Sequence, residues 1–94
     1  SIEIYFEFAK LDEIFTKITE YGVEIAHEII TQPWQQRAFR FFDPDGYLIE
    51  IAEPMWAVVI RLHNEGLLPK DIQKQTMMPL EIVNLIIKTN FGMR

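Results

Sequence analysis

The feature that most constrains the fold of this chain is the turn sequence Asp-Pro-Asp-Gly at residues 43–46. Pro44 presets a backbone φ that suits the first central position of a turn, and Gly46 accepts a positive φ. The two aspartates can hydrogen-bond nearby backbone groups. An aromatic-rich run at residues 37–42 precedes the turn, and an alternating run at residues 47–52 follows it. Two β-runs joined by such a turn predict a hairpin.

The chain before the hairpin predicts a strand, a helix and a second strand. Apolar and polar residues alternate in residues 1–8, which is the period of a half-buried strand. Apolar residues recur at helical spacing in residues 11–20, and Gly22 follows where a left-handed C-terminal cap is expected. Residues 23–31 are β-rich and predict the next strand. The order over residues 1–54 is therefore β-α-β-β-β.

The composition changes after residue 54, where a helical tail is predicted. Helical patterns cover residues 55–65, 69–76 and 79–89, and the second and third begin with a proline, which suits the first turn of a helix. The fold class is therefore α+β, with a β-α-β-β-β module at residues 1–54 and a three-helix tail at residues 55–94.

Charge and composition exclude several classes of protein. Residues 1–54 hold four Lys or Arg and eleven Asp or Glu, so this module carries −7, while the tail carries +2. An acidic module disfavours binding to a phosphate backbone, so nucleic acid is not predicted as a partner. No apolar run approaches the length of a membrane span, and no membrane partner is predicted. The chain has no cysteine, which fits a cytoplasmic protein.

One group of residues in and before the hairpin matches a known family pattern. These residues are Trp34, Gln36, Arg37, Phe39, Arg40 and Phe41, followed by Asp43-Pro44-Asp45-Gly46 and Leu48-Ile49-Glu50-Ile51. In this order they resemble the second half of the glyoxalase/bleomycin-resistance/dioxygenase superfamily, also called the vicinal oxygen chelate family. The resemblance covers residues 2–54. Gln35 and Tyr47 depart from it, because many relatives have glycine and histidine there.

The resemblance implies that this chain holds half of a larger site. Domains of the family normally pair two β-α-β-β-β modules, so that eight strands curl around a cavity, and only one such module is present here. An open four-stranded sheet leaves one face unfilled, so we expect the chain to form a homodimer that completes the cavity.

The resemblance also implies candidate metal ligands. The family's ligands lie on the first and last strands of each module, and these positions fall on Glu3 and Glu50, with Glu50 also the candidate catalytic residue. The alternation agrees, since it places both carboxylates on the strand faces opposite the aliphatic residues. Oxygen ligands suit a divalent ion such as Mn, Ni, Fe, Zn or Mg, provided that other groups complete the shell. The alternative is a solvated strand face with no metal. His27 is a further candidate ligand, with a surface strand histidine as the alternative.

Candidate substrate-binding residues are Trp34, Arg37 and Tyr5. Aromatic rings could line an apolar pocket, with Arg37 or Arg40 as an anchor for an anion. The alternative is that the rings belong to the core and the arginines are charges at the sheet edge.

Three functions are compatible with these residues. The first is a metal-dependent lyase, isomerase or dioxygenase, or a fragment of one, acting on a small oxygen-chelating substrate. The second is a non-catalytic small-molecule-binding module of the bleomycin-resistance type. The third is a regulatory or dimerisation protein that acts through the helical tail. DNA binding by the last predicted helix is disfavoured, because it offers Glu81, Asn84 and Lys88 among aliphatic residues.

Overall fold

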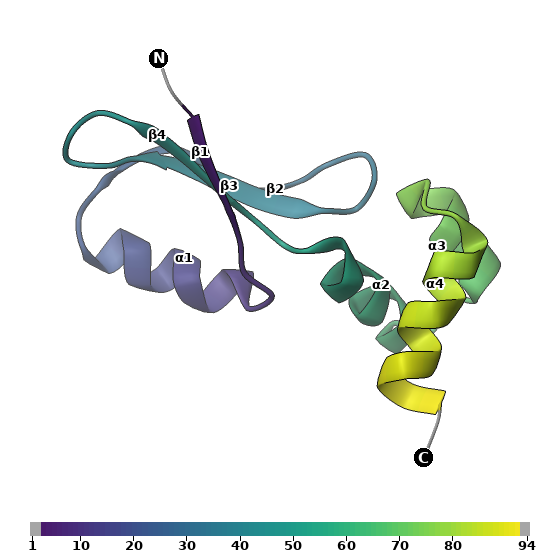
Figure 1. The fold of residues 1–94 in the computed structure, drawn as a ribbon. Coiled ribbons are helices and arrows are strands. Elements are labelled where there is room, and N and C mark those ends of the chain that lie inside the picture. Colours follow the sequence, from purple (N-terminus) through teal and green to yellow (C-terminus); the bar gives the residue numbers. More distant parts are fainter. Residues whose placement is uncertain (1–2, 93–94) are drawn as a thin grey trace. The chain divides into compact units, whose positions relative to one another are not determined.

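The computed structural model describes residues 3–92 (Figure 1). The elements are β1 (Glu3–Glu7), α1 (Leu11–Glu20), β2 (Glu24–Thr31), β3 (Arg37–Phe42), β4 (Leu48–Ala52), α2 (Met55–Asn64), α3 (Pro69–Thr76), α4 (Leu80–Ile87) and a π-helical segment, η1 (Lys88–Gly92). This order confirms the predicted α+β class. The predicted first strand also included Ser1 and Ile2, which lie outside the described residues.

The described residues divide into two compact units. The sheet unit contains the residues up to 32 and those from 36 to 54, while the helical unit contains residues 33–35 and those from 55 onward. No helix within residues 3–92 is long and apolar enough to cross a membrane.

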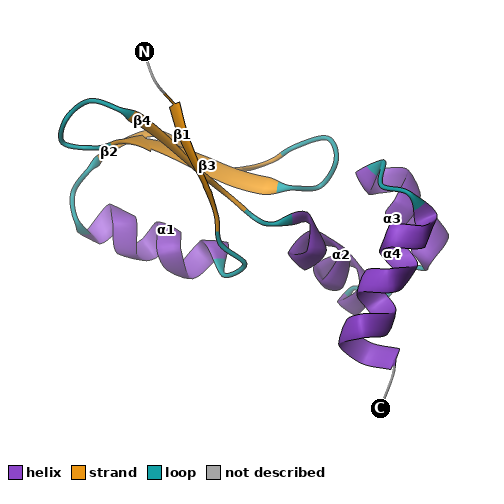
Figure 2. Cartoon of the chain, in the orientation of Figure 1, coloured by secondary structure: helices purple, strands orange, loops and turns teal. Residues whose placement is uncertain are grey.

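The sheet unit is a four-stranded sheet with one helix on one face (Figure 2). The strand order is β1-β4-β3-β2, in which β1 runs parallel to β4 and the other two pairs are antiparallel. The parallel pair needs a crossover, which α1, β2 and β3 provide between β1 and β4 in the chain. The register pairs Glu50 with Tyr5 on one side and with Arg40 on the other. Three strands therefore bring polar residues side by side at the middle of the sheet.

The core of the sheet unit lies between the sheet and α1. Leu11, Phe39, Phe41, Ile49 and Ile51 form its buried centre. Ile14, Phe15 and Ile18, at helical spacing on α1, pack against it. Because side chains alternate along a strand, the residues between the buried ones point to the other side of the sheet. We call that side the polar face, which carries Glu3, Tyr5, Glu7, Arg40 and Glu50.

The hairpin turn has the hydrogen bonds and the glycine conformation that its sequence predicts. Asp43 Oδ1 accepts hydrogen bonds from the backbone N–H groups of Asp45 and Tyr47, both at 2.9 Å. The N–H of Gly46 donates to the carbonyl oxygen of Asp43 at 2.9 Å, and Gly46 has a φ of 88°. A residue with a Cβ is strained at that φ, which explains the glycine.

The helical unit has a separate core. Val58, Val59 and Leu62 of α2 pack with Ile72 of α3 and Val83 of α4. Residues 33–35 of the loop between β2 and β3 belong to this unit, and Arg61 Nη2 donates to the carbonyl oxygen of Gln35 at 2.7 Å. Gln35 has a φ of 73°, in the left-handed region that favours glycine. The backbone thus explains why the family pattern has glycine at this position.

Replacing Gln35 by glycine should raise the free energy of unfolding by up to about 1 kcal/mol, because glycine adopts this φ without strain from a Cβ. The gain is limited, since glycine also enlarges the entropy of the unfolded chain. Urea denaturation followed by circular dichroism measures the change. The matched control is Gln32→Gly, at a residue whose φ is not positive. It should destabilise the protein, and equal effects of the two changes would contradict the strain at Gln35.

Candidate functional site

The centre of the polar face is an arginine between two carboxylates. Arg40 of β3 contacts Glu50 of the adjacent strand β4, with its Nε and Nη2 atoms both 2.9 Å from Glu50 Oε1. Its Nε also lies 3.6 Å from Oε2 of Glu3, on β1. The Glu50 side chain is 15 % exposed, against 38 % for Arg40 and 41 % for Glu3. Glu50 is therefore the most enclosed of the three, and a charge-assisted pair with a partly buried carboxylate is stronger than one in open water.

Tyr5 and Gln36 extend this cluster along β1 toward the end of β4. The hydroxyl of Tyr5 donates to Oε2 of Glu7 at 2.9 Å, and Gln36 Nε2 donates to the Tyr5 oxygen at 3.2 Å. Gln36 Nε2 also donates to the carbonyl oxygen of Glu53 at 2.8 Å. The pKa of Tyr5 is raised above 10.0, first by partial burial and then by its hydrogen bond to Glu7. Its hydroxyl therefore keeps its proton at neutral pH and remains a hydrogen-bond donor.

The carboxylates of the polar face do not fit a metal ion within one copy of the chain. Glu3 and Glu50 would supply the hard oxygen ligands that divalent ions prefer. However, the guanidinium of Arg40 already contacts both of them. A cation at that position would face the positive charge of Arg40. Within residues 3–92, no three His, Cys, Asp or Glu side chains gather closely enough to hold an ion.

The structure brings together only some of the residues predicted for the site. Glu3, Tyr5 and Glu50 share the polar face, as the alternation predicts. Arg37 has the opposite strand parity to Arg40 and points to the α1 side, where its Nη2 is 2.7 Å from Oδ2 of Asp12. Trp34, half-buried, lies in the loop that belongs to the helical unit. The roles predicted for these residues in binding stay predictions.

Arg37 joins the start of β3 to the end of β4. Its Nε lies 3.4 Å from Glu53 Oε2, and its backbone N–H donates to Glu53 Oε1 at 3.1 Å. The Glu53 side chain is only 4 % exposed, whereas Asp12 is 73 % exposed. The pKa of Arg37 is raised, first by its hydrogen bond to Asp12. Sequence reasoning missed Glu53, because nothing local marks a glutamate as buried.

The histidines occupy different surroundings. His27 of β2 pairs in register with Arg40, is half-buried, and has its Nδ1 atom 2.9 Å from the carbonyl oxygen of Glu28. His63 of α2 packs its ring against Phe91, with 4.7 Å between the ring centroids.

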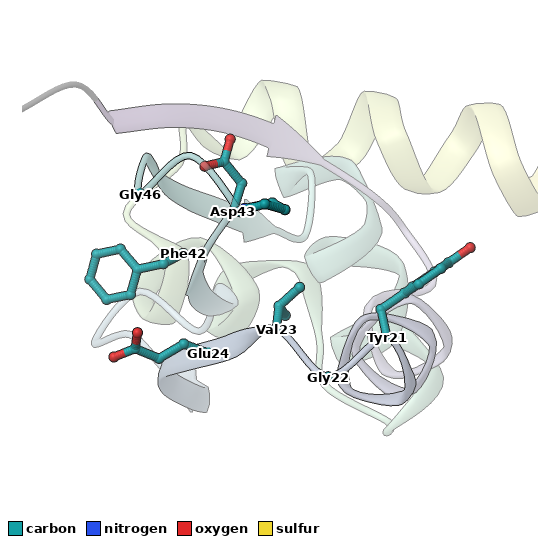
Figure 3. Close-up of a pocket in the computed structure, with 8 residues that line it drawn as sticks. Tyr21, Gly22, Val23, Glu24, Phe42, Asp43 and Gly46 are labelled. Atoms are coloured by element: carbon teal, nitrogen blue, oxygen red, sulfur yellow. The ribbon is translucent and has the colours of Figure 1, made fainter.

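An open depression lies at the end of the sheet beside the hairpin (Figure 3). Its volume is about 600 Å³, and its lining residues are Tyr21, Gly22, Val23, Glu24, Phe42, Asp43, Pro44 and Gly46. Figure 3 shows Phe42 and Tyr21 on opposite sides of it. Asp43 uses Oδ1 to hold the turn, and Tyr21 is 84 % exposed. The polar face, where charged and hydroxyl groups converge from three strands, is the stronger candidate site.

Comparisons with known proteins agree with the resemblance seen in the sequence. Residues 1–56 match the model of a family described as "Glyoxalase-like domain". No curated protein gives a match.

Solved structures similar to this chain come from several bacteria. A protein of unknown function from Agrobacterium tumefaciens str. C58 is 44% identical over 57% of this chain and 42% of that chain, with a TM-score of 0.53. A member of the glyoxalase/bleomycin resistance protein/dioxygenase superfamily from Sphaerobacter thermophilus DSM 20745 is 35% identical over 54% of this chain and 41% of that chain, with a TM-score of 0.51. TioX from Micromonospora sp. ML1 is 25% identical over 54% and 42%, with a TM-score of 0.53. The chain thus spans less than half the length of these structures.

Proposed function

Because this chain belongs to the glyoxalase-like domain family, we propose that it binds a small molecule on the polar face of its sheet, without a metal ion. This is the binding-module function, rather than the metal-dependent lyase, isomerase or dioxygenase. The observation that carries the proposal is the placement of Arg40 between Glu3 and Glu50. The guanidinium balances the carboxylates where a metal ion would otherwise do so.

The charges of the polar face favour a neutral or cationic ligand. Glu3, Glu7 and Glu50 carry three negative charges there, whereas Arg40 carries one positive charge. Tyr5 offers a hydroxyl, already fixed by Glu7 and Gln36. These groups come from strands with a defined register, so little entropy is lost in orienting them when a ligand binds. An anion would meet net negative charge, so Arg40 is not proposed as an anion anchor.

We further propose that a second copy of the chain encloses the ligand. The polar face of one sheet is open, with Tyr5 49 % exposed and the Arg40 side chain 38 % exposed. Ligand sites in proteins are usually concave and bury most of the ligand. A homodimer in which two such faces enclose one cavity would meet that requirement.

The charge preference can be tested with three probes that share a ring and differ in charge: benzylamine, benzyl alcohol and benzoate. In a buffer with a chelator, saturation-transfer NMR should detect the amine and the alcohol and detect the acid least. Glu50→Gln should weaken benzylamine about five- to tenfold, because removing one partly buried carboxylate removes about 1 kcal/mol of attraction. The matched control is Glu20→Gln on the exposed surface of α1, which should leave binding unchanged.

The same variant separates binding from metal-dependent chemistry. We expect Mn²⁺ titrated into the wild-type protein to cause no selective broadening of amide signals in β1 and β4. Selective broadening that disappears in Glu50→Gln would contradict the proposal and support the metal-dependent function. Benzoate binding as tightly as benzylamine would contradict the charge argument.

A further inference from the structure

The helical unit carries an apolar stripe that its own core does not use. On α4, Val83 is fully buried, whereas Ile82 is 42 % exposed and Leu85 is 58 % exposed. Leu68, just before α3, is 67 % exposed and lines a hollow of about 330 Å³ together with Leu80 and Asn84 of α4. Leu80 precedes Ile82 by two residues and therefore lies on the opposite side of the helix, so this hollow is not part of the stripe, whose apolar side chains are Ile82 and Leu85. Large apolar side chains that gather on one surface mark an interaction site more often than scattered ones do.

Opposite charges stand at the two ends of this stripe. Glu81 lies in the first turn of α4, and Lys88 is its C-terminal cap with helical φ and ψ of −60° and −44°. Residues at i, i+4 and i+7 follow one line along a helix, so Glu81, Leu85 and Lys88 share one surface. All three are exposed. The stripe is thus apolar in the middle, negative at one end and positive at the other.

This pattern is self-complementary in one orientation only. If two copies of α4 pack antiparallel about a two-fold axis, Glu81 of each copy lies opposite the partner's Lys88, and the Leu85 side chains meet near the axis. A parallel pair about a two-fold axis would place Glu81 against the partner's Glu81 and Lys88 against the partner's Lys88. Like charges in such positions are destabilising.

We propose that α4 is a dimerisation helix, which packs antiparallel against α4 of a second copy of this chain. Leu85 and Ile82 form the apolar centre of the seam, and two Glu81–Lys88 pairs close its ends. The balanced charges fit this partner better than a nucleic acid, which would need an excess of cations on the helix. The interface uses the helical unit alone, so it goes beyond the ligand site on the sheet and does not depend on it. It is separate from the contact between polar faces proposed above, and the two contacts together would give an assembly larger than a dimer.

The test uses charge reversal in the full chain, measured by sedimentation velocity across micromolar concentrations. The wild-type protein should self-associate, and loss of the α4 contact should reduce the size of the assembly. Glu81→Lys and Lys88→Glu should each weaken the homodimer about tenfold or more, because either change turns two attractions into two repulsions. When the two variants are mixed, a heterodimer of near wild-type affinity should form, because each cation then faces an anion. Native mass spectrometry can identify this heterodimer if one variant is uniformly labelled with ¹⁵N, because lysine and glutamate have nearly the same mass and the unlabelled variants would not be resolved.

Two further variants control for folding and for net charge. Lys74→Glu on α3 changes the net charge as Lys88→Glu does, at another exposed position, and should leave dimerisation unchanged. Leu85→Ala keeps a good helix former and should also weaken the dimer about tenfold, even if a charge variant fails to fold. A wild-type monomer would overturn the proposal. So would a dimer insensitive to Leu85→Ala, or a mixture of folded charge variants that does not associate. None of these outcomes bears on the charge preference expected for the polar face, although a wild-type monomer would also overturn the homodimer proposed to enclose the ligand.

Discussion

Replacing Phe39 by alanine is expected to lower the free energy of unfolding by about 4 kcal/mol, the largest effect that we predict for a single substitution. The Phe39 ring is fully buried at the centre of the sheet. It meets Phe15 of α1 edge-on, with 4.9 Å between ring centroids, and stacks with Phe41 at 6.1 Å. Alanine would leave a cavity between sheet and helix that the strands cannot close, because their register is set by the ladder.

The matched control is Phe42→Ala, at a position of the same strand on the other side of the sheet. Phe42 is only half-buried, so its truncation should cost about 1 kcal/mol. Guanidinium denaturation followed by amide signals of the sheet measures both variants. A small unit with little stability to spare should be largely unfolded by Phe39→Ala at 25 °C. If both variants lowered the free energy of unfolding by similar amounts, α1 would not pack on the face of the sheet that carries Phe39.

Replacing Arg37 by methionine is expected to lower the free energy of unfolding by about 3 kcal/mol. This is more than the loss of an exposed salt bridge would cost. The reason is Glu53, whose side chain is 4 % exposed. Without the guanidinium this buried carboxylate would keep the N–H of residue 37, 3.1 Å from Oε1, but would lose its contact with the positive charge of Arg37. Removing a positive charge from beside a buried carboxylate costs more than losing an ion pair in water.

Asp12→Asn provides the contrast, because it removes the other carboxylate that Arg37 contacts. Asp12 is 73 % exposed, and pairs of exposed charges contribute less than about 1 kcal/mol. Chemical denaturation should therefore rank Arg37→Met well above Asp12→Asn. If the two variants lowered the free energy of unfolding equally, the buried carboxylate of Glu53 would not explain the effect of Arg37→Met. If Arg37→Met instead left stability unchanged and abolished ligand binding, Arg37 would return as a substrate-binding residue.

The strands and the hairpin could be predicted because their causes are local. The turn depends on residues 43–46 alone, and the alternation of residues 48–52 assigns each side chain to a face before any partner strand is known. Glu3, Tyr5 and Glu50 share a face for this reason. The three tail helices were predictable in the same way, from their spacing and, for the second and third, from prolines at their starts.

The partners of the charged residues could not be predicted, because they depend on contacts between distant parts of the chain. Arg37 and Arg40 lie in the same strand and have the same chemistry. One contacts Asp12 of α1, 25 residues away in the chain, whereas the other contacts Glu3 and Glu50. Trp34 belongs to the family pattern in the sequence, yet it lies in the loop that packs with the helical unit.

The sequence by itself therefore determined the elements of this protein, their order, and the face to which each strand residue points, since these follow from turn chemistry and from the two-residue period of a strand. Only the tertiary structure decided which charged side chains contact one another. It placed Arg40 beside Glu3 and Glu50, and it buried Glu53 beneath Arg37. The physical reason is that strand register and helix packing bring together side chains whose separation along the chain carries no information about their distance in space.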